Sequence, residues 1–452
     1  MRRNQKTLTH KLHVISMSRK MLQNTKTYAL LVILTVLVRT ILLAPGLSSL
    51  MESVIIRNSG KIITTTISPL HVDGRYIKNS LNQTVILRGV NKPTFEDDPD
   101  GVWMGSTMWT DNNVKAELDA MKSWGVNVIR CFISVELMKF DIGPSSGHPA
   151  SSHCAISARE AVRRLLTFTA ERGIYVIIVP WTVRCYYTGG QQDPLPFPPY
   201  QTSTNASAVI ANIDEFVDFW REMAMEYKNY PNVIFDFWNE PNPADTQQNF
   251  LVWLNATQQC INAVREEGFT GLILFEWRNG PYCNVYSDNN FPIGVPAYGH
   301  ALSWVQDVIE YLEDPFGNLA IDAHLYRLGG GTGQLWTDPV LEQYWNSSWA
   351  YNYTQVKMCL EYMKYKWVGE TLNVPLIVGE IGATLGWLGS NPFQHQYEMT
   401  AFENVLNILN EWNIGFIGFW WREIGVYRLH NGPPNFNPTD SGQILKAYLL
   451  AS

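Results

Sequence analysis

Apolar and polar residues follow a repeating order along the chain, in which a short apolar run precedes a loop and an amphipathic stretch. Short apolar runs bounded by turn residues are typical of buried strands, and apolar residues spaced three and four apart are typical of helices. The strand-like runs are residues 84–91, 127–132, 175–181, 233–240, 271–277, 319–326, 376–382 and 414–421. The helical stretches are residues 114–124, 158–172, 213–230, 250–267, 304–312, 353–369 and 397–412.

Strands that alternate with helices indicate parallel strands joined by helical crossovers. Eight such units close a TIM barrel, so we predict an α/β fold, a (β/α)8 TIM barrel, from about residue 84 to about residue 450. Residues 51–83 instead alternate around turns at 58–60 and 73–74, which predicts a short N-terminal β-hairpin region. We assign residues 51–452 to one domain, preceded by a separate segment of residues 1–50.

That segment has the pattern of a targeting sequence. Residues 1–50 contain eight Lys or Arg and no acidic residue, and the apolar run 28–38 follows most of the basic ones. A positive flank before an apolar run is typical of a signal peptide or signal anchor. With Arg39 tolerated, residues 28–44 reach the lower end of membrane-spanning length. We expect an extracellular protein, secreted or anchored to the cell membrane by this N-terminal helix, and cleavage is left open.

Charge and cysteine content argue against two kinds of partner, a nucleic acid and a cysteine-bound zinc ion. The remaining chain holds 26 basic against 41 acidic residues, and so acidic a body argues against a nucleic-acid partner. Six cysteines are scattered without a CxxC pair, so they do not form a zinc site. Six cysteines in an exported protein permit disulfides in 15 connectivities, which the sequence does not distinguish. We expect a monomer without a cofactor or a metal ion.

In a TIM barrel the active site lies at the carboxyl ends of the strands. The polar and aromatic residues that close the eight runs are therefore candidates for one site. They are Arg88, Asn91, Arg130, Trp181, Asn239, Glu240, Trp277, His324, Tyr326, Glu380, and Trp420 or Trp421. The run VIFDFWNEP at 233–241 is the most telling, because a charged group at the end of a buried strand is costly unless it is paired or used.

Two carboxylates at this rim, without a metal motif, suit glycoside hydrolysis. One must be a protonated acid and the other an ionised nucleophile, so their surroundings should separate their pKa values. We predict Glu240 as the acid/base and Glu380 as the nucleophile. Arg130 and a hydrogen bond from Tyr326 would keep Glu380 ionised.

Two further groups would bind the sugar. Asn239 would hold a sugar 2-hydroxyl, a contact that strengthens in the transition state. Trp420 or Trp421 would offer a ring face on which the sugar stacks.

At these residues the chain resembles glycoside hydrolase family five, the cellulase family. The matching pieces occur in the family's order: LHVDGRYIKNSLNQTVILRGVN (70–91), GVNVIR (125–130), VIFDFWNEPN (233–242), IDAHLY (321–326), VPLIVGEIG (374–382) and GFIGFWW (415–421). The resemblance implies a retaining, endo-acting hydrolase of β-1,4-glucan, with residues 51–452 as its catalytic domain. It matches Arg130 to the arginine near the nucleophile, and His324 and Tyr326 to the pair that orients the carboxylates. It also matches Asn239 and Glu240 to the family's asparagine and acid/base, Glu380 to the nucleophile, and Trp420 to the −1 subsite tryptophan.

The chain departs from many cellulases of that family at the end of the third strand. They end this strand on Asp-x-His, whereas the chain reads VIIVPWT and places Trp181 where a histidine is expected. The exchange removes a polar contact to the −1 sugar and adds a ring, which weakens a specific assignment to cellulose. Other branches of the family, including β-mannanases, also vary there.

Three alternatives remain. The substrate could be β-mannan, β-1,3-glucan or a glycoside with a non-sugar aglycone, a choice that loops 182–207 and 327–352 would decide. The barrel could be a non-catalytic, membrane-tethered surface that binds glycans. It could also be a metal enzyme that uses His148, His153 and Cys154, although no HExxH motif accompanies them.

Overall fold

A computed structural model describes residues 54–58, 61–65, 67–106, 108–188, 209–210, 212–241, 247–276, 302, 304–326, 352–383, 385 and 392–451. The chain divides into two units, residues 1–52 and 53–452, and the described residues all belong to the second unit. The predicted targeting segment 1–50 therefore lies outside the described residues. Among the helices of the described part, none is long and apolar enough to cross a membrane.

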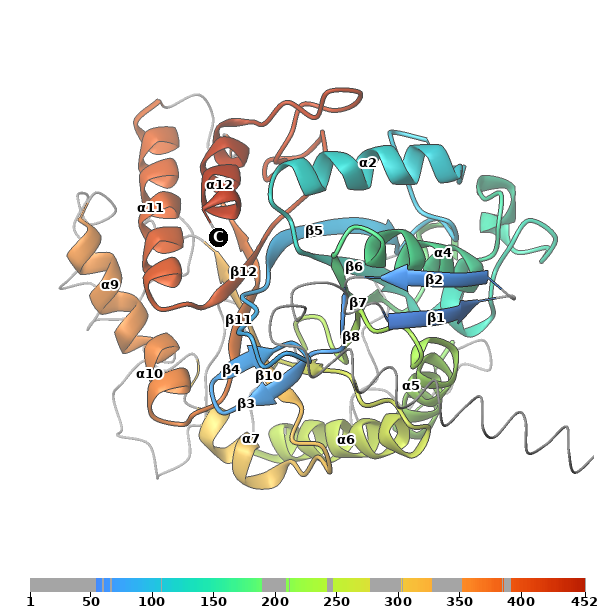
Figure 1. Cartoon of the computed structure of the whole chain (residues 1–452), viewed down its shortest axis with the longest axis horizontal. Coiled ribbons are helices and arrows are strands. Elements are labelled where there is room, and N and C mark those ends of the chain that lie inside the picture. Colours follow the sequence, from blue (N-terminus) through green and yellow to red (C-terminus); the bar gives the residue numbers. More distant parts are fainter. Residues whose placement is uncertain are drawn as a thin grey trace, which may run out of the picture. The chain divides into compact units, whose positions relative to one another are not determined.

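Eight parallel strands form a closed barrel in chain order, with the last strand paired to the first (Figure 1). They are β5 (Arg88–Phe95), β6 (Val128–Ser134), β7 (Tyr175–Thr182), β8 (Val233–Asp236), β9 (Ile273–Phe275), β10 (Leu319–Tyr326), β11 (Leu376–Gly382) and β12 (Gly415–Gly418). Each overlaps one of the eight predicted runs, so the predicted (β/α)8 barrel is confirmed.

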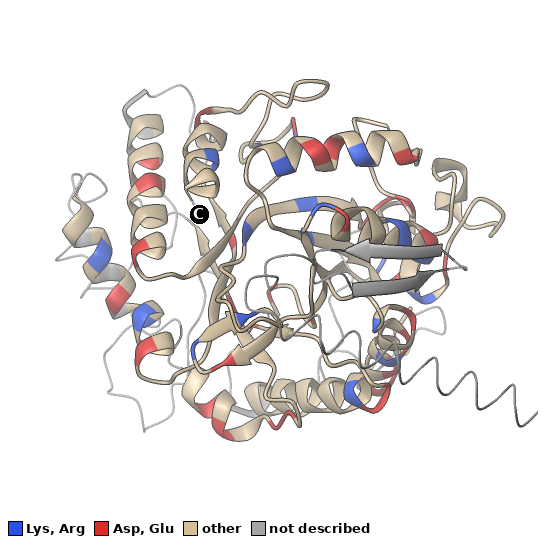
Figure 2. Ribbon diagram, viewed as in Figure 1, with Lys and Arg blue, Asp and Glu red and all other residues tan. Residues whose placement is uncertain are grey.

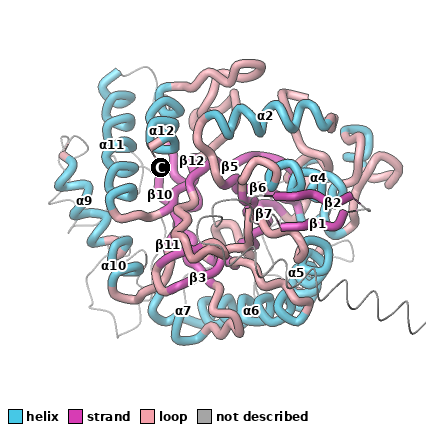
Figure 3. The backbone as a smooth tube through the Cα atoms, in the orientation of Figure 1, coloured by secondary structure: helices cyan, strands magenta, loops and turns pink. Residues whose placement is uncertain are grey.

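Helices surround the strands, and the loops join the two layers (Figure 3). The longer ones are α2 (Asp111–Ser123), α4 (Ala158–Ala170), α5 (Ile213–Tyr227), α6 (Gln247–Glu266), α7 (Val305–Tyr311), α9 (Tyr353–Tyr362), α10 (Tyr365–Glu370), α11 (Pro392–Glu411) and α12 (Asp440–Leu450). Shorter turns are α3 (Val135–Lys139), η1 (Pro149–His153) and η2 (Tyr186–Thr188). Charged residues lie along these helices, as on α2 and α11 (Figure 2), whereas α4 buries Ala161, Val162, Leu165 and Leu166.

Two hairpins precede the barrel, as the alternation in 51–83 predicts. Strands β1 (Val54–Asn58) and β2 (Lys61–Thr65) pair antiparallel, and so do β3 (His71–Asp73) and β4 (Tyr76–Lys78). The turns lie at the predicted positions, since residues 58 and 61 pair across the first and residues 73 and 76 across the second.

The first barrel strand begins later than predicted. Thr84 bridges to Lys78, so the start of the apolar run 84–91 extends the hairpin β3–β4 instead of entering the barrel. Barrel pairing begins at Arg88, whose guanidinium donates to Asn410 Oδ1 at 2.6 Å, away from the carboxyl ends. The prediction that Arg88 closes a strand at the active-site rim is therefore wrong.

The predicted helix 353–369 is also interrupted. Lys364 has a φ of +73°, in the left-handed region, and this residue separates α9 from α10. Apolar spacing continues across the break, which is why the sequence pattern indicates one helix.

Candidate active site

The site lies where the inward side chains of β6, β10 and β11 meet the segment after β8. Asp322, His324 and Tyr326 alternate along β10, so their side chains share one face of the strand. His324 is the register partner of Glu380 on β11, and Tyr326 is the partner of Gly382. This pairing brings the predicted histidine and tyrosine beside the predicted nucleophile.

A bulge at Gly379 sets that register. Pairing shifts by one residue between Ala323 and His324, so that Gly379 is the extra residue on β11. The Gly379 N–H donates to Asp322 Oδ1 at 2.7 Å, and a Cβ on this glycine would lie 2.1 Å from both carboxylate oxygens of Asp322. Only glycine allows this approach, and the bulge turns Glu380 toward His324.

Glu380 is held by two donors. Arg130 Nη1 donates to Glu380 Oε1 at 2.7 Å, and the Tyr326 hydroxyl donates to Oε2 at 2.5 Å. The side chain of Glu380 is 5% exposed, and burial raises the pKa of its carboxyl. Arg130 and the Tyr326 hydrogen bond act in the opposite direction, because both favour the ionised form. Both predicted contacts to Glu380 are confirmed.

Glu240 lies beyond the end of β8, in a left-handed backbone conformation with a φ of +45°. Its Oε1 lies 2.8 Å from Nδ1 of His324, and its side chain is 42% exposed at the mouth of the barrel. Desolvation by the surrounding protein raises the pKa of Glu240, and the more distant Arg130 lowers it only in part. No salt bridge to Lys or Arg is formed by Glu240 within the described residues, in contrast to Glu380.

The two carboxylates face each other across His324. One oxygen of Glu240, one ring nitrogen of His324 and one oxygen of Glu380 all lie within 4.8 Å of one another. Retaining glycosidases have carboxyl groups about 5–5.5 Å apart, whereas inverting enzymes need about 6.5–9.5 Å to admit a water molecule. The spacing thus fits nucleophilic attack by one carboxylate while the other acts as an acid.

Arg130 is the cation at the centre of the site, and its side chain has no exposed surface. Besides Glu380, its guanidinium donates to Asp236 Oδ2 at 2.9 and 3.2 Å and to Asn239 Oδ1 at 3.0 Å. Burial alone would lower the pKa of Arg130, but Asp236 and the other carboxylates raise it, so the guanidinium stays charged. Asn239, predicted to hold a sugar hydroxyl, is oriented by Arg130.

Aromatic rings form one wall of the site. Trp181 packs against Phe132 with ring centroids 4.5 Å apart, and its edge meets Trp420 at 6.0 Å. Trp420 stacks on Phe419 at 4.6 Å. Trp181 and Trp420 are partly exposed, whereas Trp421 is fully buried. Of the two predicted residues Trp420 and Trp421, Trp420 is therefore the one whose ring is available to a substrate.

Three buried acids of the site are absent from the predicted set. Asp236, Glu276 and Asp322 have no exposed surface and surround Arg130 at 2.9, 3.9 and 3.5 Å. Burial raises the pKa of Asp236, and it raises those of Glu276 and Asp322 well above the ordinary values. The available signal was a single acid within each apolar run, at VIFD, ILFE and LAID.

His324 lies at the centre of these acids as a neutral base. Burial lowers the pKa of its imidazole to about 3, against the opposing effect of Glu380. A neutral imidazole has only one N–H, so its two nitrogens cannot both donate.

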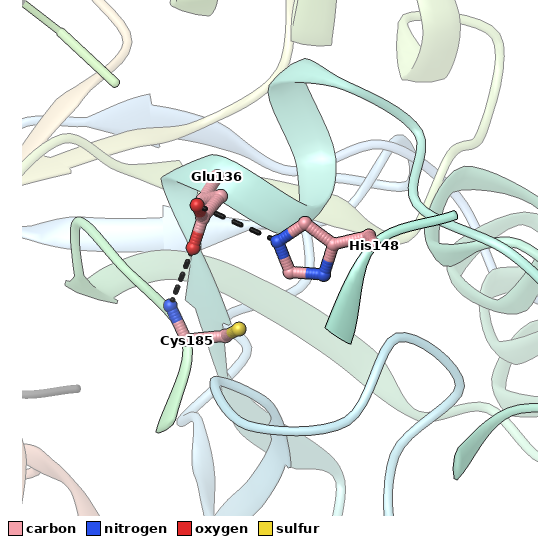
Figure 4. Close-up of side chains that lie close together, drawn as sticks. All are labelled: Glu136, His148 and Cys185. Carbon is pink, nitrogen blue, oxygen red and sulfur yellow. Dashed lines mark hydrogen bonds and ion pairs between the residues drawn. The ribbon is translucent and has the colours of Figure 1, made fainter. Parts of the chain in front are cut away.

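A separate cluster lies beyond β6 and β7, where ligand atoms of Glu136, His148 and Cys185 come within 4.8 Å of one another (Figure 4). The Cys185 backbone N–H donates to Glu136 at 3.0 Å, the Thr188 hydroxyl also donates to this carboxylate, and His148 Nε2 lies 3.5 Å away. The guanidinium of Arg184 approaches to 3.9 Å. The carboxylate of Glu136 thus joins two loops, and a nearby guanidinium disfavours a metal ion.

The metal-site alternative based on His148, His153 and Cys154 does not match this arrangement. His153 stacks on Tyr187 with ring centroids 4.3 Å apart, and the Cys154 thiol lies 3.6 Å from the Ser151 carbonyl. Two further triads have ligand-compatible spacing, Glu240–His324–Glu380 and Glu276–Asp322–His324, and both belong to the site described above. Cys131, Cys154, Cys185 and Cys260 are buried free thiols.

Residues 83–424 match the family described as cellulase, glycosyl hydrolase family 5. The chain belongs to this family. Endoglucanase 1 of Robillarda sp. (strain Y-20) is 25% identical over 174 residues, 38% of this chain and 40% of that protein. Beta-mannanase/endoglucanase A of Caldicellulosiruptor saccharolyticus is 22% identical over 352 residues, 76% of this chain and 20% of that protein.

The chain therefore spans less than half the length of these curated relatives. An endocellulase structure from Pyrococcus horikoshii has a TM-score of 0.60 at 18% identity, covering 85% of this chain and 99% of that one. This similarity shows the shared barrel fold.

Proposed function

We propose that the protein is a retaining, endo-acting glycoside hydrolase that cleaves β-1,4-glucan of the cellulose type. The spacing of Glu240, His324 and Glu380 within 4.8 Å carries the proposal, because it suits double displacement. Membership of the cellulase family supports it, as do the relatives named endoglucanase. The Pyrococcus horikoshii endocellulase contains cellotetraose, a β-1,4-glucan fragment, in its structure.

The reaction has two steps. The Glu380 carboxylate attacks the anomeric carbon while the glycosidic C–O bond breaks, and Glu240 gives its proton to the departing oxygen. Glu240 then accepts a proton from water, whose oxygen attacks the anomeric carbon and releases Glu380. Arg130 and Tyr326 stabilise the Glu380 carboxylate before the first step and again as it is released.

A mannan substrate is the second candidate, supported by the relative named beta-mannanase/endoglucanase A and by Trp181 in place of histidine. Loops 182–207 and 327–352 would separate the two, and most of their residues, 189–207 and 327–351, lie outside the described residues. β-1,3-Glucan is a further outcome of the same test, through laminarin, and small glycosides are tested by the aryl glycosides used for Glu240.

The test is reducing-sugar release on carboxymethyl cellulose, lichenan, glucomannan, galactomannan and laminarin. Glu380→Gln serves as the inactive variant, and Glu171→Gln, at a side chain 43% exposed on the surface, is the matched control. The proposal is supported if wild type and Glu171→Gln release sugar from cellulose and lichenan and Glu380→Gln does not. Release from the mannans alone would keep the mechanism and make mannan the substrate. Binding without release from any polymer would favour the non-catalytic glycan-binding barrel.

The acid role of Glu240 has its own test. Glu240→Ala removes the proton donor, so hydrolysis of natural polymers should fall about 10²- to 10⁴-fold. Aryl glycosides with good leaving groups need no acid in the first step and should keep that step. Equal loss on both substrates would contradict the acid assignment.

We also propose that the protein acts outside the cell, secreted or held at the membrane by its N-terminal segment. The basic, acid-free residues 1–26 and the apolar run 28–38 support this location. A tagged full chain should appear in the medium or the membrane fraction, and a purely cytosolic distribution would refute it.

A further inference from the structure

Glu276 follows β9 and is fully buried behind the proposed acid/base. Its Oε1 accepts the backbone N–H of Glu240, and its Oε2 lies 3.2 Å from Nε2 of His324. The other ring nitrogen, Nδ1, lies 2.8 Å from Glu240 Oε1. Glu276 thus contacts the backbone of Glu240 directly and its carboxylate through His324, yet neither step above uses it.

The position of one proton decides what His324 does. The closest carboxyl neighbours of the neutral imidazole are Glu240 at Nδ1 and Glu276 at Nε2, with Glu380 3.6 Å from Nδ1 and Asp322 3.8 Å from Nε2. The ring has one N–H, so when both of the closest contacts are hydrogen bonds, the nitrogen without the proton accepts one from its neighbour. If Glu276 is ionised, Nε2–H donates to it, and Nδ1 accepts the proton of Glu240 Oε1. If Glu276 is protonated, it donates to Nε2, and Nδ1–H donates to Glu240 Oε1.

The two arrangements differ in the acid proton available to a substrate. In the first, the Glu240 proton is directed at the buried His324. In the second, Oε1 of Glu240 is already an acceptor, so its proton resides on Oε2, the oxygen that His324 does not contact. Only the second arrangement leaves the proton free for the departing glycosidic oxygen at the exposed mouth.

The surroundings of Glu276 favour the protonated form. Among the described residues, the Lys or Arg nearest to Glu276 is Arg130, which is 3.9 Å away and is shared with Asp236 at 2.9 Å and Glu380 at 2.7 Å. Burial raises the pKa of Glu276 well above its ordinary value, and the nearby Asp322, Asp236 and Glu240 raise it further. The Nε2 contact is not a fully formed hydrogen bond, but catalytic contacts are often long before substrate binds.

We propose that Glu276 is a protonated positioning residue that fixes His324 as the Nδ1–H tautomer and thereby keeps the catalytic proton on Glu240 Oε2. The contacts from both Glu276 oxygens carry this inference. It rests on the proposed role of Glu240 as the acid/base.

Two variants at this position separate a proton-holding role from simple packing. Glu276→Gln mimics the protonated acid, because its carbonyl accepts the Glu240 N–H while its amide donates to Nε2. It should keep kcat/KM on polymer within about threefold of wild type, with an unchanged alkaline limb. Glu276→Leu removes donor and acceptor and should lose about 10²-fold on polymer, with little loss on aryl glycosides that need no acid.

The protonation state has readouts that do not depend on activity. In full-length protein labelled with ¹⁵N-histidine, the His324 signals, assigned with His324→Gln, should show the Nδ1–H tautomer in wild type and in Glu276→Gln. Infrared difference spectra of wild type minus Glu276→Gln should show the carbonyl stretch of a buried carboxylic acid. Thermal melting of Glu276→Leu shows whether the variant is folded at the temperature of the activity assay.

Loss of activity in Glu276→Gln equal to that in Glu276→Leu, or an Nε2–H tautomer without the acid band, would overturn the inference. If wild type hydrolyses no glycan, the proposed function fails, and the two spectra still decide the state of Glu276 and His324.

Discussion

Replacement of Tyr326 by phenylalanine isolates one of the two donors to the proposed nucleophile. The Tyr326 hydroxyl donates to Glu380 Oε2 at 2.5 Å, while its ring packs edge-on against Phe419 at 5.7 Å and Tyr427 at 5.4 Å. Phenylalanine keeps these ring contacts and removes only the O–H. The remaining donor, Arg130 at Glu380 Oε1, stays in place.

The expected shift follows from the strength of this bond. A hydrogen bond to a charged group contributes about 1.5–3 kcal/mol, and about 1.4 kcal/mol corresponds to one pKa unit. The bond favours the ionised form of Glu380, so its removal raises the pKa of Glu380 further, by about one to two units. Because the nucleophile must be ionised, the acid limb of the kcat/KM profile should move to higher pH by this amount.

The assay is the pH dependence of kcat/KM on a soluble β-glucan for wild type and Tyr326→Phe. Tyr175→Phe is the matched control, because it also removes a buried hydroxyl, which donates to the Ser68 carbonyl at 2.9 Å. Tyr175 is the first residue of β7, at the strand end opposite the site. The control should leave both limbs in place, and Tyr326→Phe should leave the alkaline limb in place, since that limb reports Glu240. An unmoved acid limb in Tyr326→Phe would refute the role of this bond in holding Glu380 ionised.

Three further outcomes follow from other contacts. Gly379→Ala places a Cβ 2.1 Å from the Asp322 carboxylate, so it should lower the free energy of unfolding by about 1–3 kcal/mol or more and misplace Glu380. Denaturant unfolding measures the first effect and kcat the second, and wild-type values for both would contradict the bulge argument. Asp314→Asn breaks a buried pair with Arg265 at 2.8 Å and should cost about 3–5 kcal/mol. Burial raises the pKa of Asp314, but Arg265 and the backbone N–H groups of Asn318 and Phe316 together lower it more. The stabilisation is therefore present above about pH 4 and disappears as pH falls through the lowered pKa, and acid unfolding of the variant should lack this component. Trp181→Ala should raise KM for polymer about two- to tenfold without a matching loss of kcat, whereas a fall in kcat alone would exclude a stacking role.

The barrel is predictable from the sequence because each strand carries its own signal. A buried parallel strand must be apolar along its length, and the helix that follows must bury one face, so the two periods alternate visibly. The rim follows from topology alone, since the carboxyl ends of all eight strands meet at one edge. This is why Arg130, His324 and Glu380, remote in sequence, are predicted together and found in contact.

The buried acids of the site are harder to predict. Asp236, Glu276 and Asp322 lie within or directly after apolar runs, where period and propensity describe the backbone and not the side chain's partner. Such an acid is tolerated because of its contacts, as between Arg130 and Asp236 or between the Gly379 N–H and Asp322. Both of these contacts depend on the register between strands. Register between separate strands is set by the closed barrel, so no local window of sequence contains it.

The charges around Arg130 explain why the two proposed catalytic carboxylates differ. One guanidinium cannot compensate Asp236, Glu276, Asp322 and Glu380 at once, because each uncompensated buried charge costs several kcal/mol. The closest contacts go to Asp236 and Glu380, and the acids farther from the guanidinium have the most strongly raised pKa values. Arg130 therefore favours the ionised form of Glu380. Glu276, which lies on the Nε2 side of His324 and farther from Arg130, is favoured in its protonated form. Apolar side chains of similar volume in place of these buried charged groups would often give an equally stable or more stable protein. The desolvation cost of this network is therefore better explained by the chemistry at the barrel mouth than by stability.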